Sequence, residues 1–90
     1  MLRASEPLFQ RTEEHKKQIQ HTLGSAIRKR RQELELTQEG VAARAALHVS
    51  YVAQLERGER NPSLLIICAL ATALECEPWE LLRPPDDERA

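Results

Sequence analysis

The side chains that could perform catalysis or hold a metal are few in this chain of 90 residues, and they do not cluster. Cys68 and Cys76 are eight residues apart, and no group of His and Cys residues has metal-ligand spacing, so neither a zinc site nor a disulfide framework is predicted. No nucleophile is paired with a base, and no phosphate-binding loop is present. We therefore expect no enzymatic activity, no cofactor and no metal, which leaves a binding function as the alternative.

One set of binding side chains lies on the exposed face of a helix expected over residues 49–57. Val52 and Leu55 form its apolar face, and four residues are expected to be exposed near its N-terminal half: Val49, Ser50, Ala53 and Gln54. A glutamine amide can both donate and accept hydrogen bonds, a serine hydroxyl can do either, and a valine offers an apolar contact. This face is therefore a candidate binding surface.

The helices that must position this face are predicted by apolar periodicity and by caps. Four residues recur at helical spacing and predict a helix over residues 21–35: Leu23, Ile27, Arg31 and Leu34. Thr37 is a natural N-cap for a second helix that runs to about Ala45, and Gly58 suits the left-handed residue after the third helix. Two helices therefore precede the binding face closely in sequence.

Two further helices are expected after it. Ser63 caps a helix over about residues 64–74, and Pro78 stands just before a short helix over residues 79–82. The chain contains no run of alternating β-branched residues that would predict a strand. We therefore expect an all-α protein.

Charge and composition divide the chain into three parts. Residues 1–20 form an N-terminal extension that is partly helical or disordered, residues 21–83 form the domain, and residues 84–90 form a disordered acidic tail. The net charge is −1, yet residues 22–61 carry seven basic and five acidic side chains, whereas residues 62–90 carry two basic and six acidic ones. This asymmetry can orient a protein on DNA. No signal peptide or membrane span is recognisable, so we expect the cytoplasm.

A resemblance to a known family rests on the stretch from Thr37 to Gly58, which reads TQEGVAARAALHVSYVAQLERG. It resembles the helix-turn-helix of the XRE family, which includes Cro-type and phage-repressor domains. The match continues without a gap through RNPSL at residues 60–64 to WELL at residues 79–82, and it covers about residues 23–82. The resemblance implies a compact five-helix, phage-repressor-like DNA-binding domain in which the second and third helices form the helix-turn-helix.

The resemblance also implies roles for individual residues. It points the four residues of the exposed face, Val49, Ser50, Ala53 and Gln54, at base edges. It makes Arg31 and Glu56 an ion pair that joins the first helix to the third. Phosphate contacts, which fix the register of a protein on DNA, are expected from a further set: Gln38, His48, Tyr51, Arg57, Arg60 and Asn61.

Three positions depart from the family pattern. Ala46 replaces the usual turn glycine, which would cost on the order of 1 kcal/mol in a left-handed conformation. His48 replaces the usual Ser or Thr cap, and it is either simply an exposed side chain or a contact to DNA as imidazolium. Gly40 loosens the second helix by about 1 kcal/mol.

The expected helix over residues 64–74 is apolar all round. The residues expected to face inward already form a full apolar face. The other side of the helix is also apolar, so it too must be covered. The inward stripe consists of Leu64, Ile67, Leu70, Ala71 and Leu74. The cover is either the N-terminal extension, through Leu8, Phe9 and Ile19, or a second protomer. The candidates for a dimer interface are Leu65, Ile66, Ala69, Trp79 and Leu82.

The sequence therefore predicts a sequence-specific transcriptional regulator that binds double-stranded DNA as a homodimer. A palindromic operator with half-sites about one helical turn apart fits such a dimer. Repression by occluding polymerase is the simplest mechanism, although activation through a surface contact is equally compatible. The alternative is a protein-interaction module on the same fold, antitoxin-like or coactivator-like, that works through a partner. No small-molecule effector and no membrane contact are indicated.

Overall fold

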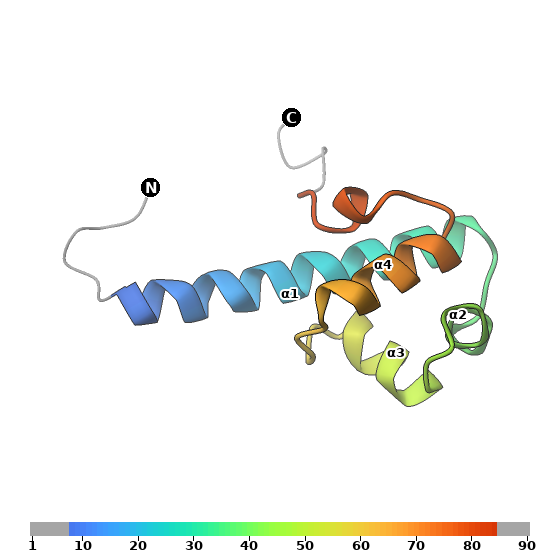
Figure 1. Cartoon of the computed structure of the whole chain (residues 1–90), viewed down its shortest axis with the longest axis horizontal. Coiled ribbons are helices and arrows are strands. Elements are labelled where there is room, and N and C mark those ends of the chain that lie inside the picture. Colours follow the sequence, from blue (N-terminus) through green and yellow to red (C-terminus); the bar gives the residue numbers. More distant parts are fainter. Residues whose placement is uncertain (1–7, 85–90) are drawn as a thin grey trace.

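The computed structural model describes residues 8–84, with side chains from Thr12 onward, and the regular secondary structure of this part of the chain consists of helices alone (Figure 1). The elements are α1 (Leu8–Glu33), α2 (Gln38–Ala45), α3 (Val49–Glu56), α4 (Leu64–Ala73) and the 3-10 helix η1 (Pro78–Leu81). The all-α class is confirmed, but the expected fifth α-helix is a single 3-10 turn, so the described residues contain four α-helices. The expectations for residues 1–7 and 85–90 lie outside the described residues.

α1 begins at Leu8 and not near residue 21, so one helix crosses the expected boundary at residue 20. Residues 8–22 contain no glycine or proline and are rich in Glu, Lys and Gln, which favour helices. Lys16 and Glu13, one turn apart, form an ion pair of 3.0 Å. The N-terminal half of α1 projects beyond the other helices (Figure 1), and therefore shows no apolar periodicity.

This projection bears on what covers α4. The side chain of Ile19 is 52% exposed, so it does not serve as the cover that the sequence suggested. The side chains of Leu8 and Phe9 lie outside the described residues. A second correction concerns Leu64, which was assigned to the inward stripe but is 72% exposed, because it is the first residue of α4 and extends past the core.

Side-chain caps start two of the helices as predicted. The hydroxyl of Thr37 accepts a hydrogen bond from the Gly40 N–H at 2.9 Å, and that of Ser63 accepts one from the Ile66 N–H at 3.2 Å. His48, at the start of α3, forms no side-chain cap. The Tyr51 N–H, at the third position of α3, donates instead to the His48 carbonyl at 3.1 Å.

All four α-helices end in the same manner. A residue one or two positions after each helix has a positive φ, and the N–H of the next residue donates to the carbonyl five residues earlier, at 2.9–3.0 Å. The four residues are Glu35 (φ 57°), Ala46 (58°), Gly58 (75°) and Glu75 (59°). The left-handed turn expected at Ala46 and at Gly58 is confirmed, while Glu35 and Glu75 were not foreseen. Each of the three non-glycine residues costs about 1 kcal/mol.

The core lies between α1 and the three shorter helices. It is formed by apolar residues from every element: Leu23, Ile27, Val41, Ala42, Val52, Leu55, Ile67, Leu70, Ala71, Leu74 and Leu81. α1 lies against the C-terminal end of α3 at Gly24, where a Cβ atom would stand 2.4 Å from the Leu55 carbonyl oxygen and 2.7 Å from that of Glu56. Only glycine allows the two backbones to come this close.

Two arginines from different helices hold the C-terminal end of α4. Arg30 Nε of α1 donates to the Leu74 carbonyl at 2.8 Å, and Arg44 Nη1 of α2 donates to the Ala73 carbonyl at 3.0 Å. Both cations face the negative end of the helix dipole and satisfy carbonyls that the helix leaves unpaired. They explain how α4 is oriented against α1 and α2.

Replacing Gly24 by alanine should destabilise the protein by about 1–3 kcal/mol, because backbone atoms of α3 would have to move. Gly40 provides the matched control, since a Cβ there meets nothing closer than 3.4 Å. Gly40→Ala should raise stability by about 0.5–1 kcal/mol through helix propensity. Urea unfolding of both variants measures the difference. Equal midpoints for the two variants would rule out the close approach.

Candidate nucleic-acid interface

The exposed side of α3 is set by what lies beneath it. Val52 and Leu55 are 0% and 1% exposed and fix the inner face of the helix, while Val49 is 40% exposed and Ser50 is exposed. Ala53 and Gln54, the other two predicted base-reading residues, are half-buried. The N-terminal half of α3 therefore presents a small surface, with one hydroxyl and one amide among its four side chains.

A buried carboxylate fixes α3 to the rest of the domain. The side chain of Glu56 is 5% exposed, and its Oε2 lies 2.6 Å from Arg31 Nε of α1. Its Oε1 accepts further hydrogen bonds from Arg31 Nη2 at 3.0 Å and from Gln38 Nε2 at 3.1 Å. Arg31 also donates to the Leu36 carbonyl at 3.1 Å, and the bonds to Glu56 raise the pKa of Arg31 above its usual value. This network joins α1, α2 and α3.

Gln38, the first residue of α2, also takes part in this network. The sequence predicts that it contacts phosphate through its side chain and its backbone N–H. In the structure its amide donates one hydrogen bond to Glu56, which leaves the second amide N–H and the N-terminal backbone of α2 for the predicted contact. The sequence offered no signal for this hydrogen bond, because residues 38 and 56 are joined only by the packing of α2 on α3.

Apart from Tyr51, which lies within α3, the remaining predicted phosphate contacts lie just outside the two ends of this helix. His48 precedes it, and Asn61 follows it; both are exposed. Arg60 is exposed as well, with its guanidinium carbon 5.0 Å from the centre of the Tyr51 ring. This distance suits a cation–π interaction. These groups lie around the α3 face rather than on it.

Arg57, the last of this set, is paired with an acid. Its Nε and Nη2 donate to the two carboxylate oxygens of Glu59 at 2.9 Å and 3.1 Å. Both side chains are more than half exposed. The hydrogen bonds from Arg57 lower the pKa of the Glu59 carboxyl, so this acid is ionised at neutral pH. No local pattern predicts this pair, although the spacing of two residues across Gly58 permits it.

The described residues offer little for catalysis or for a metal. They contain no group of three or more acidic, His or Cys side chains that could hold a metal ion. A cleft of about 480 Å³ lies between α1 and η1, lined in part by Cys76, Glu80 and Lys29. Burial, followed by the charge of Glu80, raises the pKa of the Cys76 thiol, so it is a poor nucleophile at neutral pH. No helix within residues 8–84 has both the length and the apolar character that a membrane crossing needs.

A short α2 and α3 in this order, with a buried link to α1 and an exposed α3 face, define a helix-turn-helix domain. The family model for helix-turn-helix domains, HTH_3, matches residues 27–81. The chain belongs to this family, in keeping with its XRE-type sequence, and its relatives are DNA-binding transcriptional regulators.

Three proteins illustrate the likeness. The chain is 42% identical over 65 residues to the uncharacterized HTH-type transcriptional regulator y4dJ of Sinorhizobium fredii. The aligned residues cover 72% of this chain and 84% of that protein. The restriction-modification controller protein C.AhdI from Aeromonas hydrophila is 45% identical, with a TM-score of 0.67 over 69% of this chain and 94% of its own. The hypothetical transcription factor NHTF from Neisseria is 27% identical, with a TM-score of 0.75 over 99% of this chain and 94% of its own.

Replacing Glu56 by alanine should cost roughly 3–5 kcal/mol of stability, because Arg31 would keep a largely buried charge without its partner. Glu59→Ala removes a carboxylate from an exposed pair with Arg57 and should leave the unfolding midpoint nearly unchanged. Thermal unfolding of the two variants measures the contrast. A Glu56→Ala protein as stable as Glu59→Ala would show that the network does not hold α3.

Proposed function

We propose that the protein is a sequence-specific transcriptional regulator that binds a palindromic operator as a homodimer. The observation that carries this proposal is the fixed position of α3. The helix is held from beneath, and the small surface of its N-terminal half is exposed. A major groove about 12 Å wide admits such a helix. The relatives named as transcriptional regulators support the same reading.

Base reading is assigned to Val49, Ser50, Ala53 and Gln54. Of these, Gln54 has the only side-chain amide, which can pair with both hydrogen-bonding groups of an adenine edge. Because it is half-buried, its rotamers are restricted before DNA arrives, which lowers the entropy cost of the contact. The face as a whole is weakly polar, so half-site spacing and DNA shape contribute to specificity.

Phosphate contacts are assigned to the groups around the α3 face. Arg60, Asn61, Tyr51 and His48 supply side-chain donors, and the start of α2 supplies backbone N–H groups. These contacts carry no base information, but they fix the depth and angle at which α3 enters the groove. Repression then follows from occupancy, because a dimer of this size on a promoter excludes polymerase.

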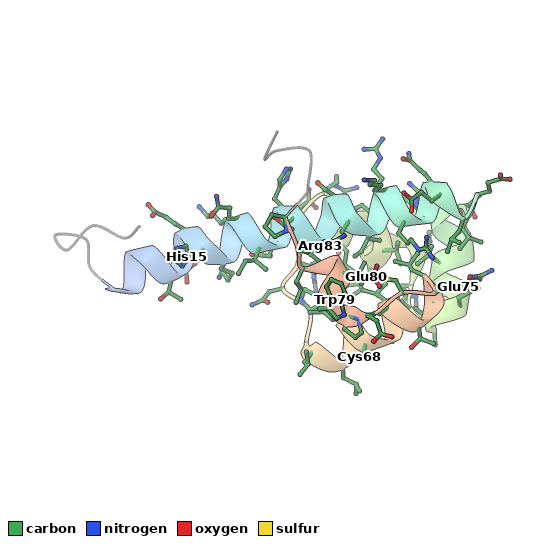
Figure 2. All side chains as sticks on the ribbon, turned by 90° about the horizontal axis from the view of Figure 1, so that it is seen from above. His15, Cys68, Glu75, Trp79, Glu80 and Arg83 are labelled. Atoms are coloured by element: carbon green, nitrogen blue, oxygen red, sulfur yellow. The ribbon has the colours of Figure 1, made fainter. Side chains whose placement is uncertain are left out.

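The interface of the homodimer is assigned to an apolar surface formed by α4 and by the C-terminal turn, which consists of η1 and residues 82–83. Leu65 is 80% exposed, Trp79 is 58% exposed and Leu82 is 38% exposed, and Leu64 adjoins them at the start of α4. Trp79 and Arg83 lie together at this turn (Figure 2), with the guanidinium carbon 5.3 Å from the ring centre. Ile66, proposed earlier for the interface, packs against the core of its own domain, and Ala69 is half-buried.

The same exposed surface favours a second candidate function, a module that works through a partner protein. Large apolar side chains this exposed are unusual on a monomer and indicate a surface that becomes covered. In this case the partner, and not a second copy, would cover Leu65 and Trp79. DNA binding would then require that partner.

Selection of bound sites from random DNA tests the primary function and separates the two candidates. The purified protein alone should enrich an inverted repeat with half-sites about one helical turn apart. Gln54→Ala should lose the preference at one base of each half-site, worth about 1–3 kcal/mol. Gln32→Ala, an exposed glutamine of α1 that is assigned to no contact, should select the wild-type site. A protein that enriches no site unless a partner is added would support the second candidate instead.

Replacing Leu65 and Trp79 together by serine should weaken the dimer at least tenfold, because a dimer would bury both side chains. Both residues are exposed in the single domain, so the fold of the monomer should be retained, and circular dichroism serves as the control. Sedimentation equilibrium measures the dissociation constant. A variant that dimerises as tightly as the wild type would place the interface elsewhere.

A further inference from the structure

The residues just after α3 contain two arginines in different electrostatic states. Arg57 is bound through two nitrogens to the carboxylate of Glu59, at 2.9 Å and 3.1 Å. Arg60 rests over the Tyr51 ring, and within the described residues its guanidinium donates to no acceptor. One arginine at this edge is therefore neutralised by its own chain, and the other keeps its donors available.

We propose that Glu59 is an intramolecular competitor for DNA phosphate at Arg57, and that Arg60, placed by Tyr51, is the arginine that binds phosphate at this edge. The inference rests on the proposed function, since it concerns how the α3 surface engages DNA. The carboxylate of Glu59 occupies the guanidinium edge of Arg57 that a DNA phosphate would otherwise bind. Glu59 therefore lowers the affinity of the protein for every DNA sequence alike.

The geometry supports competition and not mere proximity. A guanidinium binds carboxylate and phosphate through the same fork of parallel N–H groups, and the Nε–Nη2 edge of Arg57 is the one that Glu59 occupies. The pair is more than half exposed on both sides, so nothing but Glu59 withholds Arg57 from an incoming phosphate.

The stack on Tyr51 has the opposite effect on Arg60. A ring beneath the guanidinium restricts the side chain without using its hydrogen-bond donors, so less conformational freedom is lost when a phosphate binds. Tyr51 is itself half-buried and packs against the core, which makes it a fixed support. Tyr51 is thus a positioning residue for Arg60, in addition to any contact of its own hydroxyl.

A protein whose binding face has one restrained and one available arginine gains in selectivity. Contacts to phosphate strengthen binding to all DNA, whereas base contacts strengthen binding only to the operator. Because the base-reading face is small, an additional phosphate contact would raise the affinity for competing genomic DNA without adding sequence information. Glu59 keeps that background binding low.

The test is the salt dependence of binding to a short mixed-sequence duplex between about 50 and 200 mM KCl. Glu59→Gln frees Arg57, so the slope of log affinity against log salt should steepen by about 0.9, and low-salt affinity should rise roughly twofold to fivefold. Glu59→Asp keeps the charge and should behave as the wild type. Arg57→Ala should leave the wild-type slope unchanged but abolish the gain in the Glu59→Gln background.

Glu13→Gln is the matched control, because it removes one carboxylate from an exposed pair, with Lys16, on the projecting part of α1. It changes the net charge equally but lies away from α3, and salt screens it. An equal gain in Glu13→Gln, an unchanged slope in Glu59→Gln, or weaker binding by Glu59→Gln would each overturn the proposal. A wild-type protein that binds neither this duplex nor any selected site would instead overturn the proposed function.

Tyr51→Ala and Tyr51→Phe test the support of Arg60. The phenylalanine variant keeps the ring and should lose from the salt slope only the contact of the Tyr51 hydroxyl, whereas the alanine variant should lose about one phosphate contact more. If both variants lose the same contact, the Tyr51 hydroxyl and not the stacked Arg60 meets the phosphate, and this part of the proposal fails.

Discussion

The carboxylate of Glu56 is almost completely buried and accepts hydrogen bonds from two helices that are distant in sequence. α3 is only eight residues long, too short to be stable as a helix by itself, so its position depends on such links. Arg31 supplies the link to α1 and Gln38 supplies the link to α2. The burial of Val52 and Leu55 stabilises the packing of α3 but is not directional. The ion pair fixes the orientation of the helix, because the hydrogen bonds between a guanidinium and a carboxylate are directional.

The approach of α1 to α3 at Gly24 belongs to the same constraint. The two backbones can come this close only because position 24 lacks a side chain, and the closeness brings Arg31, further along α1, within reach of Glu56. The surface that results is small and weakly polar at its centre and cationic beyond the C-terminal end of α3. Binding by such a surface depends on accurate placement more than on the number of contacts, which is why a buried network beneath it matters.

The sequence predicts α2, α3 and α4 well, because Thr37, Ser63 and Gly58 mark their ends by local chemistry. It does not predict the early start of α1, since a helix that is polar all round has no apolar period to detect. Contacts between distant segments were accessible only where a family resemblance supplied them, as for Arg31 and Glu56. The Gln38–Glu56 hydrogen bond, the arginine caps on α4, the exposure of Leu64 and the close approach at Gly24 depend on packing that no local pattern encodes.

The central claim is that a rigidly held α3 presents its N-terminal half to DNA. The most direct measurement is an NMR titration of the isotope-labelled protein with its selected operator duplex, followed through the backbone amides. The account predicts the largest shifts at residues 48–54, at the start of α2 and at residues 57–61, with small shifts on the inner residues of α1. Shifts concentrated on α4 and η1, with α3 unaffected, would contradict it.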